Sequence, residues 1–407
     1  MKWAATFVCW LALLAQGQEF SQRGFIEVNG NFYPQTFPID STRAIGGMVL
    51  RYEPKWHPKP WFTLEASFDG RMNSHQQVAR DLHFDWNNRS LQRARLSIRE
   101  LAAVFRKGNF TFTLGKQFIR WGEADFINPT DRFAPTDLLN LVDQEILPVT
   151  AARATYDRGN ETFNFVWQPE FTPARVPLVD QRWTFLPPAY YSFDAQDQGP
   201  TFPGRYAFGV RWNHSSARYD YSLIYYDGFN CFPDFNAQVN APKARLTYSR
   251  MYPALRLYGG DLTVPASLFT FKSEAAYYTS STKNHDEYVL YLLELERQIH
   301  EAHIIVGYAG EVVTAHGDAL QYLGERGFAR GLISHVLYTL DANRSFTLDA
   351  FVRQNGASSL IRPAFSQSFR EHWRATVGFA WLRGEASDFL GQYHRNSFAS
   401  AELRYSF

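Results

Sequence analysis

Apolar and polar residues alternate with a period of two in segments that recur along the whole chain. In one such segment Phe163, Phe165 and Trp167 would share one face of an extended strand, and Asn164 and Gln168 would share the other. Successive side chains of a strand point to opposite faces of its sheet, so this pattern predicts strands with one apolar and one polar face. The chain is therefore expected to have an all-β fold.

The lengths of the connections distinguish a soluble sandwich from a closed barrel. Very short connections, such as Lys107-Gly108, alternate with long segments such as 122–148 and 171–203. A membrane-spanning barrel has short turns at one end and long loops at the other, so short and long connections alternate along its sequence. The Greek-key crossings of a soluble sandwich do not require this alternation. We therefore predict a transmembrane antiparallel up-and-down β-barrel with short periplasmic turns and long extracellular loops. Eighteen strands are predicted, with sixteen as the alternative, at residues 23–34, 43–56, 60–73, 92–107, 109–121, 149–158, 161–170, 204–215, 217–229, 253–264, 267–280, 286–299, 302–314, 328–343, 345–357, 360–371, 373–385 and 397–407. Residues 244–248 are either one further strand or β-structure within a loop.

The composition agrees with a barrel and excludes several other classes. Beyond its first 20 residues the chain has no run of 18 apolar residues, so no membrane-spanning helix is expected. The 41 basic and 40 acidic residues nearly balance, which argues against a nucleic-acid partner. Aromatic residues make up 17% of the chain, and rings at strand ends often form belts at the membrane–water interfaces. The expected belt residues are Trp56, Trp61, Trp121, Trp373 and Trp381.

The first residues of the chain indicate export. Residues 1–17 have the features of a signal peptide, with Lys2 before an apolar stretch over residues 4–15 and small residues at Ala15 and Gly17. The alternative is a buried N-terminal strand or helix. Export is favoured because no segment that could stop transfer through the inner membrane follows.

The rest of the chain is expected to form one domain that ends on an aromatic residue. Residues 18–407 would make a single barrel, and Cys231 is the only cysteine in this range, so an internal disulfide is excluded. The last predicted strand alternates up to Phe407, the kind of terminal residue that barrel-assembly machinery recognises. These features predict the outer membrane of a Gram-negative-type bacterium, reached by secretion through the inner membrane.

The most distinctive segment is the predicted loop over residues 122–148. Asn128-Pro129 marks a turn within it, and the apolar run 138–142 could form one or two helical turns. A long loop with charges of both signs is a candidate to fold inward and narrow the lumen. Alternatively, its charges attach the loop to the barrel wall through salt bridges, or they form a specific binding site. The candidate constriction residues are Arg120, Glu123, Asp125, Asp131 and Arg132.

The start of this loop carries a resemblance to a known family. Residues 115–122 read Gly-Lys-Gln-Phe-Ile-Arg-Trp-Gly, and residues 128–131 read Asn-Pro-Thr-Asp. This pattern resembles the Gly-[Lys/Arg]-Gln-x-x-x-Trp-Gly and Asn-Pro-x-Asp motif of a large, mostly uncharacterised family of outer-membrane porin-like barrels. A looser similarity to alginate-export barrels rests on strand number and charge mixture. The resemblance implies a barrel, and it implies neither a substrate nor functional residues.

Charged residues on the polar faces of the strands are expected to point into the lumen. Facing lipid at mid-depth, an Arg or Lys would cost roughly 2–4 kcal/mol. Basic residues alone could guide anions, but carboxylates occur in equal number, so a mixed-charge lumen is expected. The candidate lumen-lining residues are Arg93, Arg95, Arg99, Arg211, Glu294, Glu296, Arg374, Glu402 and Arg404.

The function predicted from these features is a porin-like channel for passive diffusion of small polar solutes. The alternative is a dedicated export or uptake duct for one substrate class, a polysaccharide or a hydrophobic compound, working with a periplasmic or inner-membrane partner. A surface anchor and a hydrolase are further alternatives. No His-Glu-x-x-His or Gly-x-Ser-x-Gly motif occurs, so we expect no enzyme, cofactor or metal site. The expected partners are outer-membrane lipid, barrel-assembly machinery and small polar solutes, and both monomer and homo-oligomer stay open.

Overall fold

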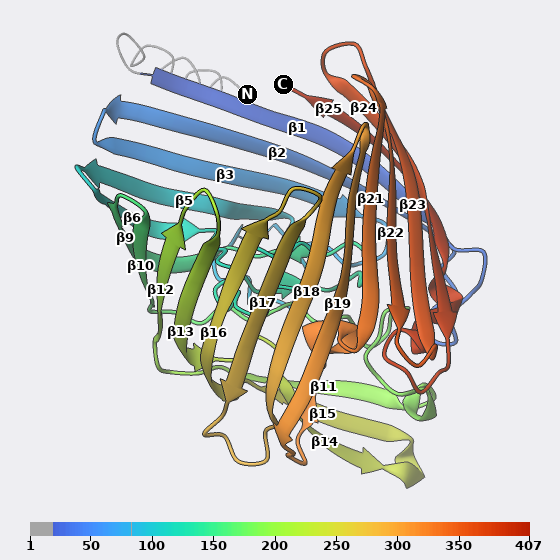
Figure 1. Cartoon of the computed structure of the whole chain (residues 1–407). Helices are drawn as coiled ribbons and strands as arrows, with labels where there is room; N and C mark the ends of the chain where they lie inside the picture. The colour runs from blue at the N-terminus through green and yellow to red at the C-terminus, as the bar shows by residue number, and fades with distance from the viewer. Residues whose placement is uncertain (1–18, 83) are drawn as a thin grey trace, which may run out of the picture.

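The computed structural model describes residues 19–82 and 84–407, so the predicted signal peptide at residues 1–17 lies outside the described residues. Within them the main sheet has nineteen strands, of which β4 (Phe84–Asp85) is a short strand parallel to β5. The other eighteen are antiparallel and close into a barrel, because β1 pairs with both β2 and β25 (Figure 1). The barrel strands are β1 (Glu19–Phe32), β2 (Ala44–Lys59), β3 (Phe62–Asn73), β5 (Leu96–Lys107), β6 (Phe110–Gln117), β9 (Val149–Arg158), β10 (Glu161–Gln168), β12 (Ala207–Ser215), β13 (Asp220–Phe229), β16 (Ala254–Pro265), β17 (Thr270–Thr279), β18 (Glu287–Ile299), β19 (Ala302–Ala315), β21 (Gly331–Asp341), β22 (Arg344–Arg353), β23 (Ser358–Phe369), β24 (Trp373–Gly384) and β25 (Phe398–Ser406).

The predicted barrel is confirmed, and each of the eighteen predicted ranges overlaps one barrel strand. Short turns lie at the end of the barrel where β1 starts and β25 ends, and the long connections lie at the other end (Figure 1). Several strand ends differ from the predicted ranges by up to four residues, and one difference moves a candidate lumen residue: the strand expected from residue 92 begins only at Leu96. Arg93 instead belongs to the preceding loop, where its backbone pairs with Gln77 and Ala79.

Apolar side chains cover the outside of the barrel, while the inward faces are buried by chain that fills the lumen. In β10, Phe163, Phe165 and Trp167 are 43%, 47% and 42% exposed, whereas the inward Asn164 and Val166 are 5% and 0% exposed. A soluble sandwich would place its large apolar side chains on the buried face. The opposite arrangement is that of a barrel whose outer face meets lipid.

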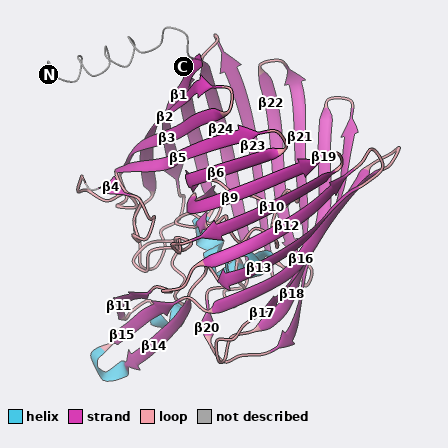
Figure 2. Cartoon of the chain, turned by 90° about the vertical axis from the view of Figure 1, so that its left-hand side faces the viewer, coloured by secondary structure: helices cyan, strands magenta, loops and turns pink. Residues whose placement is uncertain are grey.

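A second, four-stranded sheet projects from the loop end of the barrel (Figures 1 and 2). It contains β11 (Asp194–Thr201), β15 (Arg245–Met251), β14 (Asp234–Asn240) and β20 (Leu320–Gln321). Residues 244–248 therefore belong to β-structure within a loop, one of the two predicted alternatives. The strands β11 and β14 were not predicted. Polar residues dominate β11, whereas β14 has a short alternation of Phe235, Ala237 and Val239 with polar residues that could have indicated it.

The helices are short segments in the loops. They are η1 (Pro188–Tyr190), η2 (Ala241–Lys243), η3 (Gly324–Phe328) and η4 (Gly391–Asn396). None of the helices within residues 19–82 and 84–407 is long and apolar enough to cross a membrane.

Two predictions about the segment after β6 are wrong. Residues 138–142 do not form helical turns, because β7 (Thr136–Asp137) pairs with β8 (Glu145–Ile146) and the apolar side chains between them pack into the core. Trp121 was assigned to an interfacial belt but is 2% exposed and packs edge to face on Phe133 inside the barrel. Both errors arise because β6 ends at Gln117, so the chain after it turns inward.

The terminal aromatic residue completes the closure of the barrel. Gly24 and Phe407 exchange two backbone hydrogen bonds of 2.9 Å, next to the register that pairs β1 with β25. A Cβ atom on Gly24 would lie 2.5 Å from the carbonyl oxygen of Arg51 and 2.7 Å from the ring of Phe407. Glycine at this position lets the terminal ring lie against β1.

Substitution Gly24→Ala is expected to destabilise the barrel by roughly 1–3 kcal/mol, because the added methyl group displaces Phe407 or the backbone of β2. Urea unfolding followed by tryptophan fluorescence measures the change. The matched control is Gly30→Ala on the same strand, where the added atom would meet its nearest neighbour at 3.9 Å. Equal midpoints for Gly24→Ala and Gly30→Ala would contradict the closure argument.

Candidate functional site

Residues 122–148, here called the inner loop, connect β6 to β9 and run through the inside of the barrel. Its apolar residues Ile127, Phe133, Leu138 and Leu141 are buried together with inward side chains of the wall. The buried parts of such a loop lose contact with water, so their backbone polar groups need partners from the barrel or from the loop itself. Carboxylates of the wall and of the loop itself supply these partners.

The residues just before the inner loop shape its entrance. Gly115 adopts a φ of +121°, and a Cβ atom there would lie 2.2 Å from the carbonyl oxygen of Leu101, so only glycine fits. The next residue, Lys116, is buried and donates its ammonium to the carbonyl oxygen of Trp86. Gln117 donates its side-chain amide to the carbonyl oxygen of Ala151 at 3.0 Å. The Gly-Lys-Gln part of the motif thus ends β6 and joins it to the segment around Trp86 and to β9.

Asp131 closes the first turn of the inner loop. Its carboxylate accepts the backbone N–H of Trp121 and, at 2.8 Å, that of Gly122. A Cβ atom on Gly122 would lie 2.5 Å from the side-chain oxygen of Asn128, which explains glycine at that position. Burial raises the pKa of Asp131 above its usual value, although the two backbone donors act in the opposite direction. The motif residues Trp121, Gly122, Asn128 and Asp131 therefore build one local turn.

Two wall carboxylates hold this turn from the opposite side. Glu274 on β17 accepts the backbone N–H of Thr130 at 2.7 Å and its hydroxyl at 2.8 Å, and also the N–H of Ala124 at 3.3 Å. Glu294 on β18 accepts the N–H of Asp125 at 3.3 Å. Both carboxylates are almost fully buried. Sequence reasoning included Glu294 but missed Glu274, although its place on an inward face of a strand could have indicated it.

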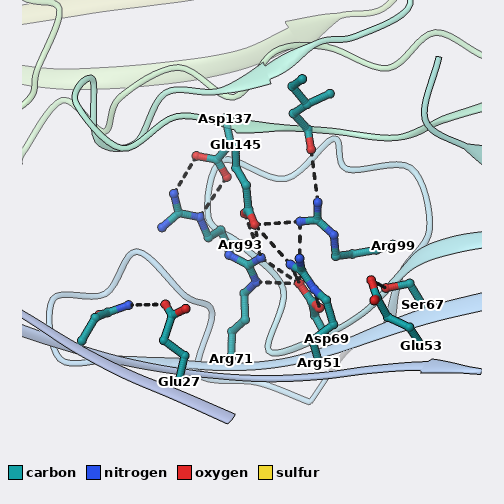
Figure 3. Close-up of polar contacts among 12 residues, drawn as sticks. Glu27, Arg51, Glu53, Ser67, Asp69, Arg71, Arg93, Arg99, Asp137 and Glu145 are labelled. Atoms are coloured by element: carbon teal, nitrogen blue, oxygen red, sulfur yellow. Dashed lines mark hydrogen bonds and ion pairs between the residues drawn. The ribbon is translucent and has the colours of Figure 1, made fainter. Parts of the chain in front are cut away.

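An arginine–carboxylate cluster attaches the far part of the inner loop to β2, β3 and β5 (Figure 3). Glu145 lies 3.2 Å from Arg51, 2.8 Å from Arg71 and 2.9 Å from Arg99. Asp69 on β3 bridges the same group through Arg51 at 2.7 Å. Burial by itself would raise the pKa of Glu145, but Arg71 and Arg99 hold it well below its usual range.

Asp137 forms a second ionic anchor beside this cluster. Its carboxylate accepts hydrogen bonds from two nitrogens of the Arg93 guanidinium, each at 2.9 Å (Figure 3). It also pairs with Arg175. Burial opposes ionisation, but the two arginines lower the pKa of Asp137 to about 2. The side chain also accepts the backbone N–H of Leu139 at 3.1 Å. The inner loop is thereby bound to the neighbouring loops.

The tip of the inner loop reaches a third part of the wall. Arg362 on β23 donates to the carbonyl oxygen of Val142 at 3.1 Å and pairs with the carboxylate of Asp143. Asn140 donates to the same carboxylate at 2.8 Å. The inner loop therefore spans the lumen from β17 and β18 across to β23.

Among the described residues, a cavity of the lumen lies on each side of this crossing. The first, of about 580 Å³, lies between the inner loop and β19, β21, β22 and β23. The second, of about 450 Å³, lies against β1, β2, β3 and β25. Both are bordered by Val142, Gln144, Glu145 and Arg362, so the loop tip and its ionic contact separate them.

The predicted constriction residues have three different environments. Arg120, Asp125 and Asp131 border the first cavity. Glu123 pairs with Arg211 at 3.0 Å. Arg132 is 6% exposed, lies over the ring of Tyr278 and pairs with Glu325 at 2.7 Å.

The predicted lumen residues are spread around the barrel wall and do not form one row of basic side chains. Arg93 and Arg404 border the second cavity, and Arg404 pairs with Glu27. Arg99 belongs to the cluster around Glu145, while Arg95 lies half-buried in the loop before β5. The remaining members lie on inward strand faces: Arg211 beside Asp261, Glu294 under the inner loop, Glu296 beside Lys272 and His303, Arg374 opposite Arg404, and Glu402 beside Arg404.

Several charged residues of the site were missed by sequence reasoning. Arg51 and Arg71 occupy inward positions of strands, so the period of two could have identified them. Asp137, Glu145 and Arg362 contact residues far away in the chain, and no local pattern indicates such pairs.

No family model matches the sequence, and no curated protein matches it either. The fold is similar to solved barrels. OccAB3 of Acinetobacter baumannii is 9% identical with a TM-score of 0.55, covering 95% of this chain and 99% of that one. A BenF-like porin from Pseudomonas fluorescens is 8% identical with a TM-score of 0.54, covering 96% and 98%. The outer membrane protein OpdK of Pseudomonas aeruginosa, also solved with vanillate, is 8% identical with a TM-score of 0.51, covering 95% and 98%. At these identities the similarity establishes a shared fold.

Substitution Glu274→Ala is expected to loosen the start of the inner loop by about 2 kcal/mol, because buried donors of residues 123–130 lose their acceptor. Trypsin should then cut after Arg120 or Arg132 in the folded barrel, which mass spectrometry of the fragments detects. Glu65→Ala is the control, since Glu65 pairs only with Lys55 at 2.6 Å among the described ion pairs and does not touch the inner loop. Equal resistance of both variants to trypsin would argue against this anchor.

Acid is expected to release the inner loop from its Asp137 anchor. The pKa of Asp137 is lowered from 3.8 to about 2, so its stabilisation, about 2 kcal/mol, is present above pH ~4 and lost as the pH falls toward 2. Pepsin cleavage between residues 122 and 148, followed between pH 4 and pH 2, measures the release. Asp137→Asn should be cleaved at pH 4 about as fast as the wild type at pH 2. A variant with the wild-type pH profile would rule out Asp137 as the titrating group.

Proposed function

We propose that the chain is a porin-like channel for passive diffusion of small polar solutes across the outer membrane of a Gram-negative-type bacterium. The observation that carries this proposal is a closed barrel with an apolar outer face and two adjoining cavities in its lumen. Cavities of about 580 and 450 Å³ are of the size that binds small molecules. A lumen crossed by a bound loop fits small solutes better than an extended polysaccharide. The similarity of fold to a BenF-like porin and to an outer membrane protein adds support.

The charges around the cavities support weak selectivity. Six arginines and seven carboxylates border the two cavities together. Rings of one sign would favour counter-ions, whereas a balanced set offers partners to solutes of either sign. We assign the narrowing to the inner loop, with Arg120 and Asp125 facing the passage and Asp131 and Arg132 attaching the loop.

The location belongs to the same proposal. Residues 1–17 would direct export and be removed, residues 18–407 would form the barrel domain, and Phe407 would be read by the assembly machinery. The motif over residues 115–131 supports membership of the porin-like family that it resembles, because its residues build the turn that starts the inner loop.

Breaking the contact between Arg362 and Asp143 is expected to raise conductance. In Arg362→Gln the tip of the inner loop loses its ionic partner on β23, so the two cavities should merge. Single-channel recording in a planar lipid bilayer should show a roughly twofold higher conductance than the wild type, with weak ion selectivity in both. Asp143→Asn should act in the same direction, because it removes the other half of the pair.

Lys243→Gln in η2 is the control, because Lys243 is exposed in the projecting sheet, outside the lumen. A wild-type barrel without conductance, which also stays closed when the inner loop is shortened, would contradict the channel. Block of the current by one solute class alone, tested with vanillate and with neutral sugars, would favour the dedicated duct. Turnover of a lipid or ester substrate would contradict a purely passive role.

A further inference from the structure

The outer face of β12, β13 and β16 changes in character toward the loop end. Leu223 and Leu262 are exposed on the lipid-facing side of β13 and β16. Nearer the loops Tyr225 lies opposite Tyr258, with ring centroids 5.3 Å apart. The next outward pair in this register is Asp227 and Arg256. The three strands lie side by side on the same wall (Figure 2).

A cationic pair lies just beyond the aromatic residues. Arg205 lies 2.6 Å from one carboxylate oxygen of Asp227, and Arg256 lies 2.8 Å from the other. The arginine side chains are 45% and 60% exposed, while that of Asp227 is 9% exposed. The Arg205 guanidinium also lies over the ring of Phe229, 5.0 Å from its centroid. Two guanidinium groups share one carboxylate, so the group keeps one positive charge on the outside of the barrel.

The position of Arg205, Asp227 and Arg256 relative to the aromatic residues indicates the depth at which they lie in the membrane. Tyr rings on the outer face are typical of the headgroup level of a membrane barrel, and charges on that face are tolerated near the interface and not at mid-depth. Arg205 and Arg256 therefore lie at the headgroups on the loop side. Guanidinium groups bind phosphate through paired hydrogen bonds. Arg256 contacts Asp227 through Nε, and Arg205 contacts Asp227 through Nη1 and the carbonyl oxygen of Gly228 through Nη2 at 3.4 Å, so the exposed Arg256 turns its two terminal nitrogens toward the headgroups.

We propose that Arg205 and Arg256, on either side of Asp227, bind the phosphate of a lipid headgroup in the leaflet on the loop side. This inference rests on the membrane location in the proposed function, and it concerns the outer face rather than the lumen. The tyrosines beneath the pair would contact the adjoining part of the lipid. The occupant is thus a phosphate-bearing lipid, and free phosphate is the alternative that the experiment separates.

The test measures lipid binding to the purified full-length barrel by native mass spectrometry. The probes are diphosphoryl lipid A and, as the comparison without phosphate, diacylglycerol, whose binding should be weak and equal in the wild type and the double variant. The double variant Arg205→Gln/Arg256→Gln should bind lipid A roughly tenfold or more weakly, given about one lost charge contact per arginine. Arg344→Gln is the matched control, since Arg344 is an exposed arginine in the turn at the opposite end and pairs with Asp341 at 2.6 Å. It should stay within twofold of the wild type.

Three results would overturn the proposal. They are unchanged lipid A binding in the double variant, an equal loss in Arg344→Gln, and full displacement of lipid A by millimolar inorganic phosphate, which would indicate a free-phosphate site. Asp227→Asn guards against a folding defect in the double variant, because it keeps both arginines. Removing the carboxylate charge leaves both arginines unneutralised, so this variant should bind lipid A more tightly. Unchanged or weaker binding would also count against the proposal. Conductance of the double variant should equal that of the wild type. A wild-type barrel that binds lipid A but conducts no ions would contradict the channel and leave the lipid site standing.

Discussion

Pairing of every backbone N–H and C=O in the barrel wall is the constraint on which the rest of the structure depends. A strand in hydrocarbon finds no water for its backbone, so the sheet must close on itself. Closure occurs where β25 pairs with β1, and the exchange of backbone hydrogen bonds between Gly24 and Phe407 extends that pairing to the last residue. The outer face can then be apolar, and the charges are placed inside or at the rims.

The same requirement applies inside the lumen, where much of the inner loop is buried against the wall. Its backbone donors are satisfied by carboxylates, with Asp131 serving from within the loop and Glu274 and Glu294 from the wall. Its carboxylate Glu145 is in turn neutralised by arginines of β2, β3 and β5, and Asp137 by arginines of neighbouring loops. Removing one partner from such a buried pair is costly, so the loop is held firmly at each end. The contact of Arg362 with Asp143 is more exposed, which makes the loop tip the weakest attachment.

Much of the wall could be predicted because its signals are local. Alternation such as that of Phe163, Phe165 and Trp167 needs only neighbours in sequence, and the parity of connection lengths gives the direction of each strand. Predictions failed where the chain leaves the barrel wall and no longer follows the alternation of strands. Trp121 and residues 138–142 follow the end of β6, where burial against other parts of the lumen decides their conformation. Arg132 illustrates the same limit, because its partner Glu325 lies in another loop.

The sequence by itself determined an all-β barrel of about eighteen strands, with sixteen as the alternative, its two kinds of connection, and a distinctive segment between residues 115 and 148. These follow from a period of two and from turn residues, which act over a few positions. Only the tertiary structure decided that the inner loop crosses the lumen, which wall residues hold it, and where the remaining cavities lie. Those properties depend on pairs such as Glu274 with Thr130 and Arg362 with Asp143, whose members lie far apart in the sequence and are brought together by the tertiary fold.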